Sequence, residues 1–247
     1  MRKKILSLCM ALALCLGLLP VTALAAEGAP SQLYVGNQPV ISGNVITYWT
    51  TDTSGGLVSA SESDSWNVKY DPTSATLTLN GATINGAYDD ATSPPYGAGI
   101  YALSSSGQPV ALTIELIGEN TITGTFGIYL NASQTSTIGT NASLVIKNSG
   151  DNGESGSLTV NGTSSYGIFI ISGTGNASLT IENASVVANT ASSYSGSGVC
   201  VQSGASATDS PNISLSVDGG SLTASGTGSN DGILFYVGQS QATGATT

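Results

Sequence analysis

Residues 112–130 read LTIELIGENTITGTFGIYL, three short phrases in which apolar and polar residues alternate. An alternation of period two indicates β-strands with one buried face. Glycine, asparagine and threonine stand where the alternation breaks, and such residues favour turns. The stretch therefore predicts three strands of four or five residues each, joined by tight turns.

The same three phrases return along the chain at near-constant spacing. The first phrase begins at Leu77, Leu112, Leu144, Leu179 and Leu215, at intervals of 35, 32, 35 and 36 residues. None of these short strands can bury its apolar face alone, so stacked coils must do so together. The repeat predicts an all-β fold, a parallel β-helix (solenoid) of about five coils with three strands per coil. A propeller blade needs four antiparallel strands, and an immunoglobulin-like sandwich does not repeat at this period.

Aligning the phrases predicts which side chains stack between coils. Four inward columns are expected: Leu77, Leu112, Leu144, Leu179 and Leu215; Leu79, Ile114, Ile146, Ile181 and Val217; Ile84, Ile122, Val160, Val186 and Leu222; and Ile100, Ile128, Ile168, Val199 and Ile233. The glycine before each member of the last column predicts a corner where a Cβ is crowded or φ is positive.

Two outward columns follow from the same alignment. The first holds Asn80, Glu115, Lys147, Glu182 and Asp218, which we interpret as a charge-compensated surface ladder. The second holds hydroxyls at Thr78, Thr113, Thr180 and Ser216, interrupted by Val145. The interruption and the variable coil length argue against an ice-binding face.

Residues 1–25 are typical of an export signal, with Arg2, Lys3 and Lys4 before an apolar run and Ala23-Leu24-Ala25 at the cleavage site. The sequence predicts a bacterial protein that is secreted or held at the cell surface. No second long apolar run is present, so no membrane span is expected.

The charge balance excludes whole classes of partner. Beyond the signal, two lysines stand against fifteen acidic residues, a net charge of −13, with no arginine or histidine. Such a chain cannot neutralise a phosphate backbone or an anionic membrane surface. Cys200 is the one cysteine beyond the signal, and we expect it to be a buried free thiol.

Residues 33–75 break the period and hold both tryptophans, Trp49 and Trp66, with Tyr34, Tyr48 and Tyr70. An open β-helix end exposes strand edges, so an aromatic-rich N-terminal cap is expected here. Aromatic faces also suit pyranose rings, and this use stays open. The predicted organisation is a signal peptide at 1–25, a cap at 26–75, a β-helix at 76–238, and a Ser/Thr-rich linker or truncated end at 239–247.

Several of these phrases resemble a known family. LYVGNQPVISGNVITYWTTD, WNVKYDPTSATLTLNGATI, LTIELIGENTITG and SLTIENASVVA are similar to clostridial secreted carbohydrate-binding domain proteins, over about residues 33–238. The resemblance implies a right-handed parallel β-helix akin to polysaccharide lyase family nine, with calcium and plant polysaccharide as ligands. The calcium ligands of that family have no residue-by-residue match in this chain.

A β-helix enzyme is the main alternative to a binding protein. A pectate lyase needs a basic side chain to remove a proton, and only Lys69 and Lys147 are available. The glutamates expected beside Lys147 favour its protonated form, which cannot act as a base. A glycosidase needs two carboxylates, and Asp89 with Asp90 or Asp151 with Glu154 offer loop pairs only loosely. We therefore predict that the protein is not an enzyme.

The same loops suit calcium better, because calcium takes six to eight oxygen ligands. The candidate metal ligands are Asp89, Asp90, Asp151, Asn152 and Glu154. They match neither the EF-hand spacing nor the nonapeptide calcium repeat.

The sequence thus predicts a secreted, non-catalytic module that binds a plant cell-wall or host polysaccharide or acts as an adhesin, with calcium as the candidate cofactor. The candidate sugar-binding residues are Trp49, Trp66 and Tyr129. A pectate-lyase-like or glycosidase enzyme and a purely structural surface stalk are the alternatives, and further domains of a longer chain are candidate partners.

Overall fold

The computed structural model describes residues 25–36, 38–86, 96–105, 107–132, 140–150, 156–191, 196–205, 210–227, 231–238 and 240–241. Strands make up the regular structure of these residues, and none of them lies in a helix. Consequently the described part of the chain offers no helix long and apolar enough to cross a membrane.

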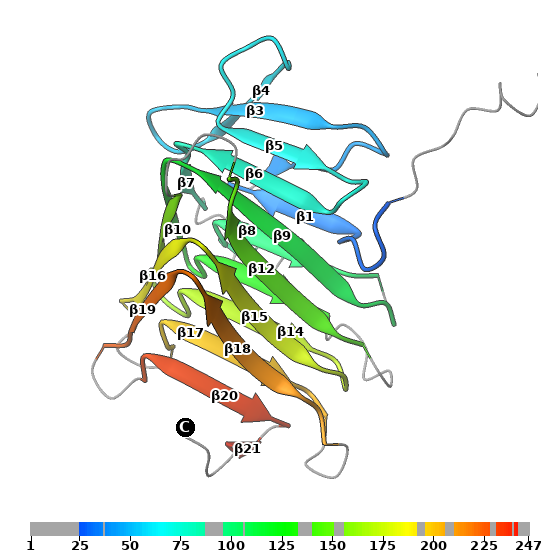
Figure 1. Ribbon diagram of the computed structural model, residues 1–247, viewed down its shortest axis with the longest axis vertical. Coiled ribbons are helices and arrows are strands. Elements are labelled where there is room, and N and C mark those ends of the chain that lie inside the picture. Colours follow the sequence, from blue (N-terminus) through cyan, green and yellow to red (C-terminus); the bar gives the residue numbers. More distant parts are fainter. Residues whose placement is uncertain are drawn as a thin grey trace, which may run out of the picture.

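Three sheets form the sides of the molecule (Figure 1). The first sheet has the order β18-β15-β12-β9-β6-β5-β3-β4, the second β19-β16-β13-β10-β7, and the third β2-β1-β8-β11-β14-β17-β20-β21. The first sheet comprises β3 (Thr47–Thr51), β4 (Leu57–Ala60), β5 (Val68–Asp71), β6 (Thr76–Asn80), β9 (Val110–Ile117), β12 (Ala142–Asn148), β15 (Ala177–Glu182) and β18 (Ile213–Asp218). The second comprises β7 (Thr83–Asn85), β10 (Glu119–Gly124), β13 (Ser157–Gly162), β16 (Ser185–Thr190) and β19 (Ser221–Ser225). The third comprises β1 (Gln32–Val35), β2 (Gln38–Pro39), β8 (Ile100–Leu103), β11 (Ile128–Asn131), β14 (Ile168–Ser172), β17 (Val199–Ser203), β20 (Ile233–Val237) and β21 (Ser240–Gln241).

From β6 onward the chain visits the three sheets in turn and adds a parallel strand to each. Between β6 and β18 it makes about four turns of a β-helix, with β3, β4 and β5 at one end and β20 and β21 at the other (Figure 1). The predicted all-β, parallel β-helix is confirmed at this level. The stretch Leu112–Leu130 supplies β9, β10 and β11, one strand to each sheet.

Inward side chains of the three sheets form one continuous core. Ile114, Ile146 and Ile181 of the first sheet have no exposed surface, and Ile122 and Ile128 of the other two sheets are equally buried. The predicted column Ile100–Ile128–Ile168–Val199–Ile233 is confirmed by the register of the third sheet.

The other three predicted columns are each wrong by two residues at one step, and Leu79, which pairs with Leu116 instead of Ile114, is one of these cases. Leu77 pairs with Ile114 instead of Leu112, and Val160 pairs with Ala188 instead of Val186. A slip of two residues returns each side chain to the same face of the sheet, so apolar patterning does not distinguish the two registers. The strands remain correctly oriented, but their outward neighbours change.

The slip also corrects both outward columns. Thr78, not Asn80, is the partner of Glu115, and Thr76, not Thr78, is the partner of Thr113. The charged column therefore runs Thr78, Glu115, Lys147, Glu182 and Asp218.

The corner between the second and third sheets requires glycine because of crowding. A Cβ on Gly167 would lie 2.5 Å from the carbonyl oxygen of Gly198, and one on Gly232 would lie 2.5 Å from that of Ala224. Of the two reasons considered for these glycines, close backbone approach is the correct one. None of the glycines directly before the third-sheet strands has positive φ, whereas Gly81, Gly118, Asn183 and Gly219, between the first and second sheets, all do.

Asparagines hold two of the corners by hydrogen bonds between coils. The buried Asn120 accepts a hydrogen bond from the backbone of Ala82 (2.8 Å) and donates to carbonyls of its own turn and of Ser157. Between the third and first sheets, Asn141 Oδ1 accepts from Asn176 N and Asn176 Oδ1 accepts from Asn212 N, each at 2.8 Å. We call this series the asparagine ladder.

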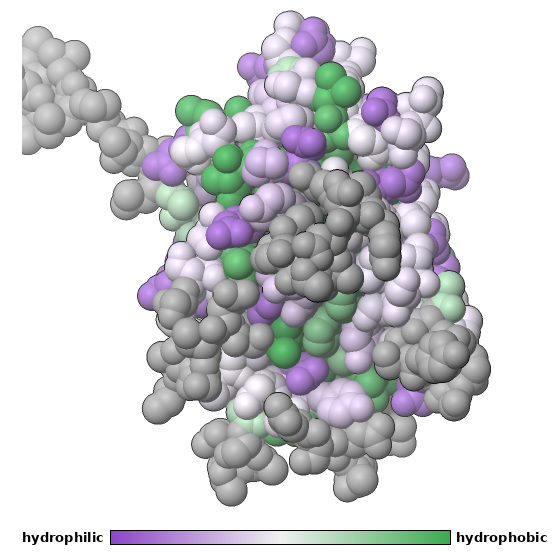
Figure 2. All heavy atoms as spheres, turned by 180° about the vertical axis from the view of Figure 1, so that it is seen from behind, coloured by the Kyte–Doolittle hydropathy of each residue, from purple (hydrophilic) through white to green (hydrophobic). Residues whose placement is uncertain are grey.

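The two ends of the solenoid differ from its middle. At the N-terminal end β3, β4 and β5 continue the first sheet in antiparallel pairing, and β1 does so for the third. At the other end the inward residues Val217, Ile233 and Phe235 are 36–41 % exposed. Seen from behind, apolar residues are visible at several places on the described surface (Figure 2).

Candidate functional site

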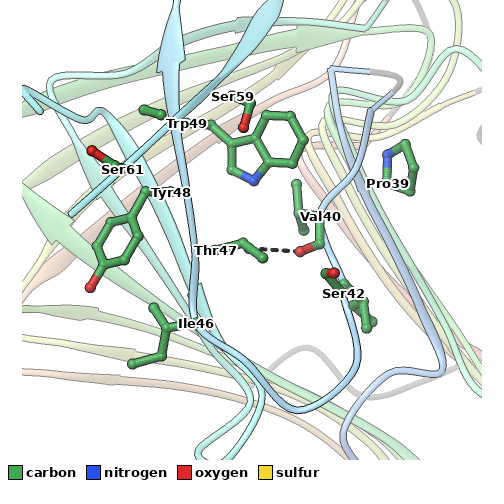
Figure 3. Close-up of a pocket in the computed structure, with 11 residues that line it drawn as sticks. Pro39, Val40, Ser42, Ile46, Thr47, Tyr48, Trp49, Ser59 and Ser61 are labelled. Atoms are coloured by element: carbon green, nitrogen blue, oxygen red, sulfur yellow. Dashed lines mark hydrogen bonds between the residues drawn. The ribbon is translucent and has the colours of Figure 1, made fainter.

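A cleft of about 550 Å³ opens at the N-terminal end of the molecule. Strands β3 and β4 form one side, and the segment that follows β2 forms the other (Figure 3). The lining residues are Pro39, Val40, Ile41, Ser42, Ile46, Thr47, Tyr48, Trp49, Ser59, Ala60 and Ser61. Apolar and aromatic side chains with a few hydroxyls are the usual composition of a small-molecule site.

Trp49 and Tyr48 are successive residues of β3, so their side chains point to opposite sides of the strand (Figure 3). Trp49 packs partly against the main hydrophobic core, and the opposite strand β4 places Ser59 beside it. Tyr48 lies 5.9 Å from Trp66 between ring centroids. The predicted residues Trp49 and Trp66 therefore belong to different surfaces, and only Trp49 lines the cleft.

The indole nitrogen of Trp49 is shielded from solvent and has no hydrogen-bond partner among the described residues. It lies on the edge of the ring that faces Thr47 and Val40 (Figure 3). The Thr47 hydroxyl already donates to the carbonyl oxygen of Val40 at 2.7 Å. A buried donor without an acceptor costs about 1–3 kcal/mol, so an oxygen that reached this edge would recover that energy.

Acidic groups lie at the rim and not in the cleft. The Asp64 carboxylate accepts hydrogen bonds from the amide and the hydroxyl of Ser61, each at 2.7 Å, and these lower the pKa of Asp64. Desolvation and the nearby Glu62 raise the pKa of the Tyr48 phenol. None of the eleven lining residues carries a charge at neutral pH.

Lys69 and Lys147 both interact with groups outside the cleft. Lys147 Nζ lies 3.1 Å from Glu115 Oε1 on the outer face of the first sheet. Lys69 Nζ lies 5.7 Å from the ring centroid of Trp66, a cation–π distance. Glu115 also accepts a long hydrogen bond from Thr78 at 3.5 Å.

Tyr129 belongs to a band of stacked rings on the outer face of the third sheet. Its ring stacks on Phe126 at 4.7 Å and on Phe169 at 5.1 Å, with interplanar angles of 22° and 18°. Burial raises the pKa of the Tyr129 phenol. The aromatic band consists of Tyr34, Tyr96, Tyr101, Phe126, Tyr129, Tyr166 and Phe169. Because these rings cover one another's faces, the band stabilises the coils more than it offers a platform.

Cys200 continues the outward column of Phe169 and is fully buried, as expected. Burial raises the pKa of its thiol to about 12. The thiol is therefore protonated at neutral pH and is a poor nucleophile.

The candidate calcium ligands Asp89, Asp90, Asp151, Asn152 and Glu154 lie outside the described residues. Within the described ranges, no three acidic, histidine or cysteine residues gather closely enough to hold a metal ion.

Sequence reasoning found Trp49 but missed the rest of the cleft. Ser42, Ile46, Ser59 and Ser61 come from a hairpin and a loop that do not repeat, so no periodicity marks them. The signal available in the sequence was the apolar pair Val45-Ile46 close before Tyr48-Trp49, outside the repeat.

No protein-family model, no curated protein and no solved structure matches this chain.

Proposed function

We propose that the protein is a secreted, non-catalytic β-helix module that binds polysaccharide or mediates adhesion. The cleft beside Trp49 is the observation that carries this proposal. An indole ring with hydroxyl groups around it suits a pyranose, whose C–H face is apolar and whose edge is hydroxylated. The relation to the clostridial carbohydrate-binding proteins belongs to the same proposal.

The proposal includes the finer description of the fold. We infer five right-handed coils, with the aromatic-rich residues 26–75 as an N-terminal cap. The sequence repeat and the antiparallel strands ahead of β6 support this inference. A capped end protects the coil edges and gives the non-repeating residues a place to form a site.

The positions of the lysines support a binding role over a lyase role. Lys147 is ion-paired with Glu115, which favours its protonated form, and Lys69 lies over Trp66. Neither lines the cleft. A pectate-lyase-like or glycosidase activity is the alternative, and release of unsaturated uronides, read as new ultraviolet absorbance, would establish it.

The proposal is tested by retention on insoluble glycans. Purified protein is incubated with microcrystalline cellulose and with calcium pectate, with and without a chelator, and the bound fraction is measured after sedimentation. Retention on either glycan supports binding, and its loss with chelator assigns a role to calcium. Host mucin glycans are tested in parallel. If the protein binds none of the three materials, a purely structural stalk is the better description.

A further inference from the structure

We propose that the cleft is selective for neutral pyranose chains and rejects uronic acid polymers. This inference rests on the proposed function and names the sugar class that the site takes. It follows from the shape of the cleft, its charge and the state of the Trp49 indole.

The shape of the cleft distinguishes it from the other aromatic surfaces. Rings of the aromatic band stack on each other, so their faces are already covered. The Trp66 ring has Lys69 at 5.7 Å and Tyr48 at 5.9 Å. Trp49 instead lines an open volume of about 550 Å³, within the ~300–1,000 Å³ typical of ligand pockets. A short stretch of sugar chain fits that volume.

The charges around the cleft disfavour a carboxylate. No lining residue is cationic, and Asp64 at Ser61 and Glu62 near Tyr48 are acidic. The nearest cation is Lys69, the cross-strand partner of Tyr48, which lies over Trp66 and does not line the cleft. A uronate would have to shed its hydration without gaining a cation, and desolvating an unpaired charge is costly. The net charge of −13 beyond the signal adds a repulsive field for any polyanion. A neutral pyranose meets neither barrier.

The indole supplies a specific contact. Its N–H has no acceptor among the described residues and is shielded from solvent on the side that faces Thr47 and Val40, so a sugar oxygen reaches it only when these cleft residues move apart on binding. A sugar hydroxyl or ring oxygen would accept this hydrogen bond while the pyranose face packs on the ring. Sites that hydrogen-bond a ligand gain selectivity because an unpaired buried donor is costly.

The test is isothermal titration calorimetry of the whole secreted chain with cellohexaose, mannohexaose and hexagalacturonate, in chelator. We expect at least one neutral hexasaccharide to bind ten-fold or more tightly than hexagalacturonate. Trp49→Ala should weaken the neutral binding at least ten-fold. Trp49→Phe, which keeps a ring but removes the donor, should weaken it about five-fold.

Two further variants test whether the effects are specific to the cleft and to its charge. Phe235→Ala removes an exposed aromatic ring at the opposite end of the solenoid and should leave the neutral affinity unchanged. Ser59→Lys places a cation opposite Trp49 at an exposed position of β4 and should raise the hexagalacturonate affinity about ten-fold. Circular dichroism confirms that each variant is folded.

The outcomes separate this inference from the proposed function. Equal affinity for neutral and acidic hexasaccharides, or neutral binding that survives Trp49→Ala, overturns the inference while polysaccharide binding stands. If none of the three hexasaccharides binds but the protein sediments with insoluble cellulose, the cleft is not the site and the inference also fails. Loss of all binding, soluble and insoluble, rejects both.

Discussion

The first sheet contains two halves that are built differently. From β6 to β18 its strands are parallel and repeat a pattern, and inward residues such as Ile114 and Ile146 have no exposed surface. From β5 to β4 its strands are antiparallel and unrepeated, and Val58 is 53 % exposed. In the repeated half nearly every side chain has a packing or turning role, so the irregular half is where a cleft can form.

The strongest test of this contrast is the truncation of one aliphatic side chain in each half. Ile146→Ala removes a fully buried side chain of β12, and we expect it to lower the free energy of unfolding by about 2–5 kcal/mol. Val58→Ala in β4 should change it by less than about 0.5 kcal/mol, because this side chain is largely exposed. Urea unfolding followed by circular dichroism measures both, and equal losses would contradict the contrast.

The next largest difference in stability between the two halves is expected from replacing a buried asparagine in one and a half-exposed asparagine in the other. Asn120→Ala leaves the Ala82 amide without its acceptor in a buried corner, at a cost of about 1–3 kcal/mol. Asn67 accepts from Thr51 and donates to Asn80 at the half-exposed edge of β5, so Asn67→Ala should cost about 1 kcal/mol or less. The same unfolding assay compares them. If Asn67→Ala lowers the free energy of unfolding more than Asn120→Ala does, the antiparallel end contributes more to stability than the coil corner.

Alkaline pH should weaken the coils through Cys200. Burial raises the pKa of this thiol from 9.0 to about 12, so the folded state favours the protonated form. Its contribution is complete below pH 9 and is lost as pH rises toward 12, about 1 kcal/mol by pH 10. Cys200→Val should lose less stability between pH 8 and pH 10 than the unaltered protein does. The free energy of unfolding of both proteins is measured by urea denaturation at each pH. If it falls equally between pH 8 and pH 10 in the two proteins, Cys200 is not the cause of the loss.

The outer face of the coils should show the smallest effect. Lys147 and Glu115 are 36 % and 28 % exposed, and exposed ion pairs contribute little. A double-mutant cycle of Lys147→Met and Glu115→Gln should give a coupling free energy of about 0.5 kcal/mol that falls further in 0.5 M salt. A coupling free energy above about 2 kcal/mol would show that the charged column, and not only the core, holds the coils in register.

In the repeated half, the sequence predicted the strands, the coils and which side chains of each strand point inward. Alternation marks inward residues such as Ile114 and Ile146, and their spacing gives the coils. It could not separate Leu77 opposite Leu112 from Leu77 opposite Ile114, because both pairings bury leucine. Loop length and corner hydrogen bonds, which decide that register, leave no mark on the apolar pattern.

The irregular half was less accessible to prediction. Its aromatic content identified Trp49 and Trp66 as candidates, but the faces they occupy depend on how β3 pairs with both β4 and β5. Antiparallel pairing places Trp49 beside Ser59 and Val68, while Tyr48 pairs with Lys69 on the other face. Only the three-dimensional arrangement shows that one tryptophan lines an opening and the other lies beneath a lysine.

The asparagine ladder has a consequence for how such a chain can change in length. Each step runs from the side chain of one asparagine to the backbone of the next, 35 residues from Asn141 to Asn176 and 36 from Asn176 to Asn212. A gene duplication or deletion that begins and ends at these asparagines would preserve every step, whereas a break elsewhere in the coil would interrupt it. The ladder thus marks natural joints at which recombination could lengthen or shorten the rod without disturbing the irregular end.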